Sequence, residues 1–367
     1  MAESRTAVAA DPDEPGRAAT TPTTSTHPTD STDSTSTRRN GPGGRHRAYD
    51  ARHRTAGTTD ADADTDPDRP ALADAALAGL SVWATAQQTG PVQRRGRYVP
   101  ESVQHPARML PAIAAHAIDA YTDPGDLVLD PMAGIGTTLV EAVHAGRDAL
   151  GVEYESRWSD IADANLRHAR TQGATGRGGV IRGDATDILT LVPAALIGQV
   201  ALVVTSPPYG PTVHGLVTTG DELDIRDNRY NDGTDKGNLA YRDLTGLADG
   251  FAQILRGCAT LLRPGGTVVV TARPWRKNGE LVDLPSAVIG AGVRAGLVPT
   301  ERCVALLAAV RDGQLVARPS FFQLQSVRKA RASGTPMHLI AHEDVLIFTK
   351  PAAPITPSTM DDAGGGG

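Results

Sequence analysis

Apolar and polar positions alternate in blocks between residues 71 and 350, and the blocks predict strands and helices in turn. Short continuous apolar runs are typical of buried strands, whereas apolar residues three and four positions apart indicate helices. The apolar runs predict strands at residues 127–129, 149–152, 180–181, 200–205, 267–271, 298–310 and 345–349. Helical spacing predicts helices at residues 71–88, 105–121, 137–145, 156–170, 241–262 and 284–295, with Ser156 as an N-cap.

The alternation of strands and helices predicts an α/β fold, in which a mostly parallel sheet carries helices on both faces. Ligands of such sheets bind beyond the carboxyl ends of the strands, at the point where the strand order reverses. Residues 263–266 read RPGG and predict a helix stop followed by a turn. The polar, glycine-rich insert at 211–239 is either a lid or base-reading loop, or a plain solvated loop.

Composition divides the chain of 367 residues, which has a formal net charge of −6, into three parts. Residues 1–70 are rich in Thr, Ser, Asp and Pro and cannot bury enough apolar surface to offset chain entropy, so we expect a disordered tail. Residues 351–367 predict a second disordered tail, which leaves 71–350 as the folded domain. The N-terminus lacks the apolar core of a signal peptide, and no run reaches the roughly 20 apolar residues of a membrane span. We therefore expect a soluble, cytoplasmic protein.

The run from Asp130 to Thr138 reads DPMAGIGTT and lies between a predicted strand and a predicted helix. Small residues there let the backbone approach a ligand, and the helix offers unpaired N–H groups. The run is neither a Walker A sequence nor a three-glycine dinucleotide fingerprint, which disfavours ATP and NAD. A tight turn without a ligand is the alternative interpretation.

Carboxylates follow three successive predicted strands, at Asp130, Glu153 and Asp184. Asp130 is placed to order the glycine run and meet a cationic ligand head, and Glu153 to hold ribose hydroxyls. Asp184 is placed to accept a hydrogen bond from an adenine amino group. Each of these acids alone is more often a helix cap than a ligand contact, but together they predict an adenosine-type cofactor.

The run from Thr205 to Gly210 reads TSPPYG and follows another apolar strand. Two prolines fix the backbone and remove N–H donors, which leaves carbonyl groups able to accept both hydrogens of an exocyclic amine. Tyr209 offers a flat face on which a planar base can stack. The alternative is a Pro-Pro turn that packs one aromatic ring.

These two runs resemble the cofactor and catalytic motifs of the amino-methyltransferases, which methylate DNA N4-cytosine or N6-adenine with S-adenosylmethionine. The resemblance covers roughly residues 100–350, with Met132 where the family usually has Phe and Ile135 where Ser is common. It implies a Rossmann-like class I methyltransferase fold: a doubly wound, mostly parallel seven-stranded sheet with a late antiparallel strand. It also implies catalytic roles for Ser206, Pro207, Pro208 and Tyr209, without a metal. The implied cofactor-binding residues are His105, Pro106, Asp130, Met132, Gly134, Gly136, Thr137, Thr138, Glu153 and Asp184.

The serine before Pro-Pro resembles the DNA cytosine-N4 enzymes, so we expect a DNA-binding methyltransferase, for which association with the nucleoid is an option. Methylation of RNA (tRNA) guanine-N2, methylation of DNA adenine-N6, and a S-adenosylmethionine-binding module without transfer activity stay open. Cytosine-C5 methylation needs a cysteine nucleophile, typically after a proline, and neither Cys258 nor Cys303 follows one. The oligomeric state stays open.

Three basic clusters predict a phosphate-contacting surface, although each is also typical of a solvated face. Their members are Arg94, Arg95 and Arg97, then Arg273, Arg276 and Lys277, then Arg328, Lys329 and Arg331.

Overall fold

The structure is a computed structural model that describes residues 79–208, 216–219, 224–227, 239, 242–277, 280–319 and 321–352. The tail predicted at residues 1–70 lies outside these ranges, as does the second predicted tail apart from residues 351 and 352. Within the described ranges, no helix is both long and apolar enough to cross a membrane.

Eight strands form the central sheet, and the strand order reverses between β2 and β5. In spatial order they are β1 (Val82–Trp83), β11 (Val298–Leu306), β14 (His342–Thr349), β8 (Leu262–Ala272), β5 (Val200–Thr205), β2 (Leu127–Asp130), β3 (Asp148–Glu153) and β4 (Gly178–Arg182). β14 is antiparallel to both of its neighbours, and the other pairings in this sheet are parallel. The predicted mostly parallel Rossmann-like sheet with a late antiparallel strand is therefore confirmed, with one strand more than expected.

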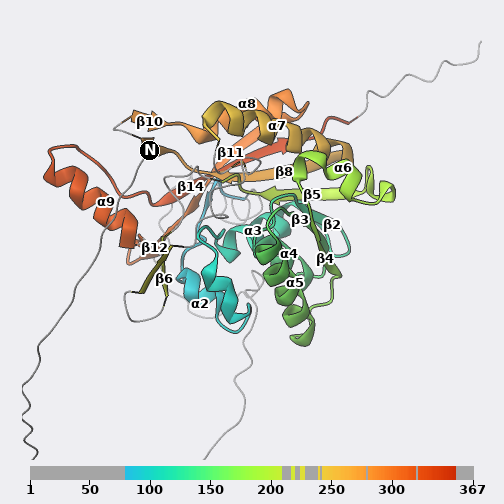
Figure 1. Ribbon diagram of the computed structural model, residues 1–367, viewed down its shortest axis with the longest axis horizontal. Helices are drawn as coiled ribbons and strands as arrows, with labels where there is room; N and C mark the ends of the chain where they lie inside the picture. Colours follow the sequence, from blue (N-terminus) through green and yellow to red (C-terminus); the bar gives the residue numbers. More distant parts are fainter. Residues whose placement is uncertain are drawn as a thin grey trace, which may run out of the picture. The chain divides into compact units, whose positions relative to one another are not determined.

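Helices cover both faces of the sheet (Figure 1). One face carries α3 (Pro111–Tyr121), α4 (Thr137–His144) and α5 (Ser156–Thr171), and the other carries α6 (Ile188–Leu191), α7 (Leu244–Leu261) and α8 (Leu284–Arg294). Side chains alternate between two apolar cores because successive strand residues point to opposite faces. In β5, Leu202 and Val204 join the core under α3 and α4, whereas Val203 joins the core under α7 and α8.

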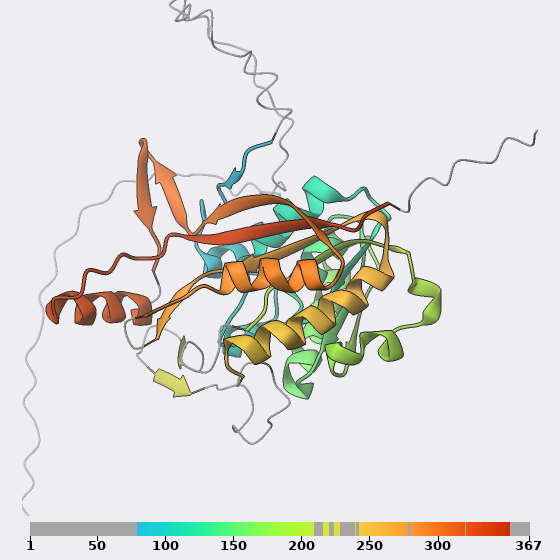
Figure 2. The same ribbon diagram turned by 90° about the horizontal axis from the view of Figure 1, so that it is seen from above.

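Smaller elements surround the sheet. The helices among them are α2 (Gly90–Arg94) and α9 (Phe321–Ala332), and the 3-10 helices are η1 (Pro100–Gln104), η2 (Ala185–Asp187) and η3 (Ala194–Leu196). Three hairpins are formed by β6 (Leu216–Thr219) with β7 (Asp224–Asp227), by β9 (Trp275–Lys277) with β10 (Glu280–Val282), and by β12 (Ala308–Arg311) with β13 (Gln314–Ala317). The β6–β7 hairpin lies within the 211–239 insert, for which the sequence pattern predicted only a loop. Figure 2 shows the β12–β13 hairpin standing out from the end of the sheet.

Two helix predictions are wrong near the N-terminal end of the domain. The described part of 71–88 contains no helix, because Val82 and Trp83 pair with β11 and Trp83 stacks 4.3 Å from the His116 ring. The helix predicted at 105–121 begins only at Pro111, since a proline disfavours helical geometry in the residue before it. Leu110 is accordingly extended, with ψ of 127°.

Other corrections concern element ends. Ser156 does not cap α5, because Glu155 occupies the N-cap position and no side chain completes the cap. The strand predicted at 298–310 is broken at Leu307 into β11 and β12, and β12 turns away to pair with β13. β8 begins at Leu262, directly after α7, so residues 263–266 start a strand instead of forming a separate turn.

Candidate active site

The glycine turn after β2 has a backbone that only glycine adopts readily. Gly134 and Gly136 have φ of 53° and 79°, in the left-handed region. A Cβ atom on Gly134 would lie 3.2 Å from His105 Nε2, and one on Gly136 would lie 3.2 Å from the Ala162 Cβ. The turn is therefore drawn close to residue 105 on one side and to α5 on the other.

Two buried carboxylates hold this turn. Asp130, at the end of β2, accepts hydrogen bonds from the Met132 N–H at 3.0 Å and from the Thr138 hydroxyl at 2.7 Å. Glu153, at the end of β3, accepts from the Gly134 N–H at 2.7 Å and from the Glu155 N–H at 2.9 Å. Their exposed fractions are 4% and 8%. The neighbouring strand ends therefore fix the loop that they border.

Burial changes the acidity of both groups. It raises the pKa of Asp130 to about 6, against the hydrogen bonds from Thr138 and Met132, which lower it. It raises the pKa of Glu153 to about 7, again against two backbone hydrogen bonds, and the nearby Glu155 and Asp130 carboxylates add to the rise. A ligand that donates hydrogen bonds or carries positive charge would favour the ionised form of either acid.

Asp184 lies at the end of β4 and caps η2. Its Oδ1 accepts hydrogen bonds from the Thr186 N–H at 2.9 Å and from the Thr186 hydroxyl at 2.8 Å. The capping alternative is thus present in the structure. The same side chain also lines the cavity described below, so a cap does not exclude a ligand contact.

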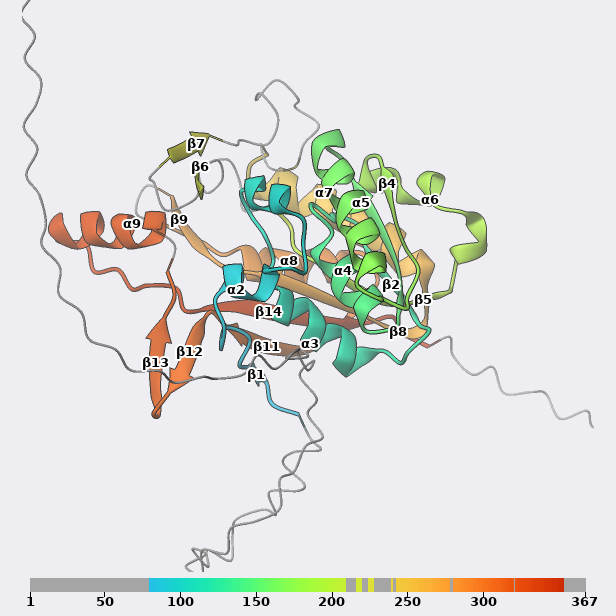
Figure 3. The ribbon, with the colours of Figure 1, turned by 90° about the horizontal axis from the view of Figure 1, so that it is seen from below.

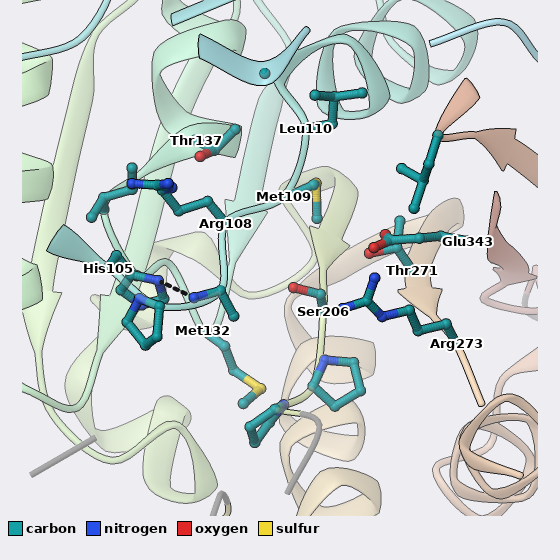
Figure 4. Close-up of a pocket in the computed structure, with 18 of the residues that line it drawn as sticks. His105, Arg108, Met109, Leu110, Met132, Thr137, Ser206, Thr271, Arg273 and Glu343 are labelled. Carbon is teal, nitrogen blue, oxygen red and sulfur yellow. Dashed lines mark hydrogen bonds between the residues drawn. The ribbon is translucent and has the colours of Figure 1, made fainter. Parts of the chain in front are cut away.

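The segment of residues 94–110, called the arm below, lies against the glycine turn through His105. The His105 ring is buried and meets Trp158 edge-on at 4.7 Å between ring centroids. The Ala107 N–H donates a hydrogen bond to His105 Nδ1, which Figure 4 draws as a dashed line at the His105 ring. Arg108, further along the arm, donates to the Ser102 carbonyl at 2.8 Å. Burial, together with the nearby positive charge of Arg94, lowers the pKa of Arg108 to about 10. Arg108 lines the cavity but was not among the predicted site residues.

Asn165, which was not among the predicted site residues, ties the arm to the turn. The residue is fully buried in α5; its Oδ1 accepts from the Val99 N–H at 2.8 Å, and its Nδ2 donates to the Ile135 carbonyl at 2.8 Å. A polar side chain within the apolar stripe of Ala162, Leu166 and Ala169 was the signal that pointed to it.

The turn after β5 forms the opposite wall. Ser206, Pro207 and Pro208 line the cavity, and Tyr209 lies outside the described residues. Figure 4 shows Ser206 close to Thr271, Arg273 and Glu343, which come from the end of β8 and the start of β14. The Thr271 hydroxyl is buried and has no hydrogen-bond partner among the described residues. Thr271 and Glu343 were not predicted as functional residues, and Arg273 was predicted only as part of a basic cluster.

One cavity of about 1990 Å³ joins the glycine turn to the Pro-Pro turn across the point where the strand order reverses. Pockets for single small ligands are usually roughly 300–1,000 Å³, so this space admits a nucleotide-sized group together with a second planar group. The predicted residues that line it are His105, Pro106, Asp130, Met132, Gly134, Thr137, Thr138, Glu153, Asp184, Ser206, Pro207 and Pro208. Gly136 is not in the wall, and its role is close packing against Ala162.

Two of the three arginines in the first basic cluster make structural contacts. Arg97 donates to both oxygens of the buried Glu141, at 2.9 and 3.1 Å from its Nε, and Arg94 Nη2 donates to the Met109 carbonyl. The Tyr98 hydroxyl also donates to Glu141, at 2.6 Å. These two arginines therefore anchor the arm. Arg94 and Arg95 also line the cavity and Arg95 is exposed, so the phosphate-contacting surface of this cluster stays a prediction.

Both cysteines lie in the core, in α7 and in β11, and neither lines the cavity. Burial raises the pKa of the Cys258 thiol well above its usual range, so this thiol is a poor nucleophile. Among the described residues, no group of three His, Cys, Asp or Glu side chains is arranged to hold a metal ion.

Comparison with known proteins gives matches over parts of the chain. Residues 59–164 match the family model of N6- and N4-type methyltransferases, described as DNA methylase. The tRNA (guanine(10)-N2)-dimethyltransferase of Methanocaldococcus jannaschii is 31% identical over 133 residues, which are 34% of this chain and 37% of that protein. The type II methyltransferase M.MthZI of Methanothermobacter thermautotrophicus is 37% identical over 54 residues, 15% of each chain. The chain thus covers well under half the length of either relative.

Among solved structures, TrmN from Thermus thermophilus aligns with 71% of this chain and 53% of its own, at 17% identity and a TM-score of 0.41.

Proposed function

We propose that this chain, a member of the S-adenosylmethionine-dependent amino-methyltransferase family, transfers a methyl group to the exocyclic amine of a nucleobase. The observation that carries the proposal is the single cavity that contains both the carboxylate-held glycine turn and the Ser206-Pro207-Pro208 turn. A cofactor site alone would account for the first turn. The second turn, on the facing wall, supplies a place for the group that is methylated.

The first wall fits the cofactor. The left-handed turn at Gly134 leaves room that a Cβ atom would fill, and Glu153 and Asp184 carry carboxylates at the ends of neighbouring strands. In the proposed complex Glu153 holds the ribose hydroxyls, Asp184 the adenine amino group, and His105 and Pro106 the methionine end. Bound S-adenosylmethionine supplies a methyl group on a positively charged sulfur, and the ionised Asp130 favours that positive charge.

The second wall fits an amine. Pro207 and Pro208 lack N–H donors and have fixed φ, so the carbonyl groups of this turn are rigid acceptors. Together with the Ser206 hydroxyl they would hold both hydrogens of an exocyclic amine and point its nitrogen towards the cofactor wall. The protein then contributes mainly by positioning and by a fixed electrostatic environment. Tyr209 is the proposed stacking face for the base.

The base that we propose is cytosine in DNA, methylated at N4, because Ser206 precedes the two prolines. A second candidate is guanine-N2 of RNA. It is supported by the relative that acts on tRNA guanine and by Gly210 after Tyr209, which tRNA guanine-N2 enzymes share.

A methyl-transfer assay separates these candidates. Purified protein is incubated with methyl-labelled S-adenosylmethionine and, in separate reactions, with total DNA or total RNA, and the digested nucleosides are identified by mass spectrometry. We expect N4-methylcytosine in DNA. N2-methylguanine in RNA, or N6-methyladenine in DNA, would show that cytosine is not the target base, while the proposed methyl transfer to an exocyclic amine would stand. Cofactor binding without label in either nucleic acid would overturn the reaction in favour of a binding module.

A further inference from the structure

The segment between β11 and β14 differs from the rest of the chain in charge. Residues 313–342 contain four Lys or Arg side chains and no Asp or Glu, although acidic residues outnumber basic ones, 42 to 36, in the whole chain. This segment forms β13, α9 and the stretch leading into β14. Figure 3 shows α9 and the β12–β13 hairpin at the same end of the molecule.

Part of this segment is fixed to the body of the domain. Arg318 donates to the carbonyls of Ala86 and Gln87, at 3.0 and 3.3 Å, which ties the segment to the body of the domain. Within the segment, Arg331 donates to the Met337 carbonyl at 2.9 Å. Val327 of α9 is buried, with 5% exposed. One side of α9 is therefore packed, and two of the four basic side chains of the segment, Arg318 and Arg331, already have structural hydrogen bonds.

Arg328 and Lys329 differ from Arg318 and Arg331. Both are exposed, and neither makes an ion pair or side-chain hydrogen bond within the described residues. At 3.6 residues per turn, Lys329 and Gln325 lie on the side of α9 opposite Val327, and Arg328 lies about 100° around the helix from Val327, on the flank next to them. Lys329, Gln325 and Ser326 also line the cavity that contains Ser206 and Gly134. A positive, hydrogen-bonding helix face thus borders the entrance to the candidate active site.

We infer that this face of α9 docks the phosphate backbone of the substrate nucleic acid, with Arg328 and Lys329 contacting phosphates. Each phosphate carries a negative charge that an unpaired cation neutralises with release of counterions. Backbone contacts of this kind set position and register without reading sequence. A strand held on α9 places a neighbouring nucleotide at the cavity entrance, from which its base can turn inward. The inference rests on the proposed function, since it assumes a nucleic-acid substrate.

The test compares Arg328→Glu and Lys329→Glu with Arg256→Glu. Arg256 is an exposed residue of α7 that does not line the cavity, so this control changes charge equally at a distant place. Binding of a labelled random-sequence DNA duplex and of a tRNA transcript is measured by fluorescence anisotropy across salt concentrations. Melting temperature and S-adenosylhomocysteine affinity, measured by calorimetry, report on folding and on the cofactor wall.

Each α9 variant should weaken nucleic-acid binding about tenfold or more at low salt and reduce the slope of log K against log salt by about 0.9 on duplex DNA. Melting temperature and S-adenosylhomocysteine affinity should stay at the wild-type values. If the wild-type protein binds and methylates nucleic acid but the α9 variants behave like Arg256→Glu, the docking surface is refuted and the proposed function stands. If the wild-type protein binds the cofactor analogue but neither nucleic acid, both are refuted.

Discussion

The Glu153 carboxylate accepts a 2.7 Å hydrogen bond from the Gly134 N–H, which joins the end of β3 to the glycine turn after β2. Its other oxygen accepts from the Glu155 N–H. The same side chain lines the cavity and is buried enough for its pKa to rise to about 7. One residue therefore shapes the turn and faces the proposed cofactor, and experiments have to separate these two roles.

Glu153→Gln should lower cofactor affinity by roughly tenfold or more. Glutamine keeps one acceptor oxygen but places an NH2 group where the second backbone N–H donates, and it loses the charge that strengthens hydrogen bonds from ribose hydroxyls. Calorimetric titration with S-adenosylhomocysteine measures the loss. Asp148→Asn is the control: Asp148 lies at the other end of β3, paired with Arg177, and its neutralisation should leave affinity unchanged. Equal losses in both variants would argue against a ligand contact by Glu153.

Cofactor binding should release protons near pH 6.5 and should weaken as the pH falls from about 7 to 5.5. In the ligand-free protein Asp130 and Glu153 have pKa values raised to about 6 and about 7, and a ligand with positive charge and hydroxyl donors favours their ionised forms. Titrations in two buffers of different ionisation enthalpy give the number of protons released, which should vanish near pH 8.5. Proton uptake at pH 6.5 would contradict this assignment.

The same raised pKa values make folding stability depend on pH in the opposite direction to cofactor binding: stability falls as the pH rises, whereas cofactor binding strengthens. Because both acids titrate at lower pH when unfolded, their contribution to stability is present below about pH 4 and is lost as the pH rises through 6 to 7. Added cofactor should restore stability most at neutral pH. Thermal melting with and without S-adenosylhomocysteine checks this: the increase in melting temperature should be larger at pH 7.5 than at pH 5.5.

Gly134→Ala should remove cofactor binding, whereas Gly173→Ala should not. Both glycines have positive φ, so alanine costs roughly 1–2 kcal/mol of stability at either position. A Cβ atom at residue 134 also lies 3.2 Å from His105 Nε2 in the wall of the cavity, whereas one at residue 173 meets nothing within 4 Å. Melting temperature should fall similarly in both variants, and affinity only in Gly134→Ala. Intact binding by Gly134→Ala would show that the turn does not contact the cofactor.

Two substitutions at Asp184 separate capping from ligand binding. Serine can still cap η2, but it is too short to reach an adenine amino group, whereas alanine loses both contacts. We expect Asp184→Ala to cost about 1 kcal/mol of stability and Asp184→Ser to cost much less. Both should weaken cofactor binding to a similar extent. Wild-type affinity in Asp184→Ser would restrict the residue to its capping role.

Asn165→Leu should release the arm over the glycine turn. Leucine has a similar size but leaves the buried Val99 N–H and Ile135 carbonyl without their partners, at a cost of roughly 1–3 kcal/mol for each group. Limited trypsin digestion should cut faster after the exposed Arg95, and cofactor affinity should fall. Ser102→Ala, which removes a single hydroxyl from the same network, should have a smaller effect on both. Unchanged digestion of Asn165→Leu would mean that other contacts hold the arm.

The sequence by itself determined the α/β pattern, the glycine turn and the positions of β2, β3, β4 and β5 to within two residues. These features are local: a short apolar run, a glycine that tolerates positive φ and a proline that removes a donor act within a few residues. Because parallel strands end at one edge of a sheet, the acids that follow them were also predicted to converge. The chemistry of the cavity walls could therefore be proposed before any coordinates.

Only the tertiary structure decided how the remaining residues are used. Trp83 extends the sheet because it pairs with β11, more than 200 residues away, and Arg97 is drawn inward by Glu141 on α4. Asn165 and α9 likewise acquire their places from contacts distant in sequence, and Thr271, Arg273 and Glu343 meet Ser206 through neighbouring strands. Periodicity along the chain records which residues are buried, but the partners that bury or pair them are set by strand order and packing.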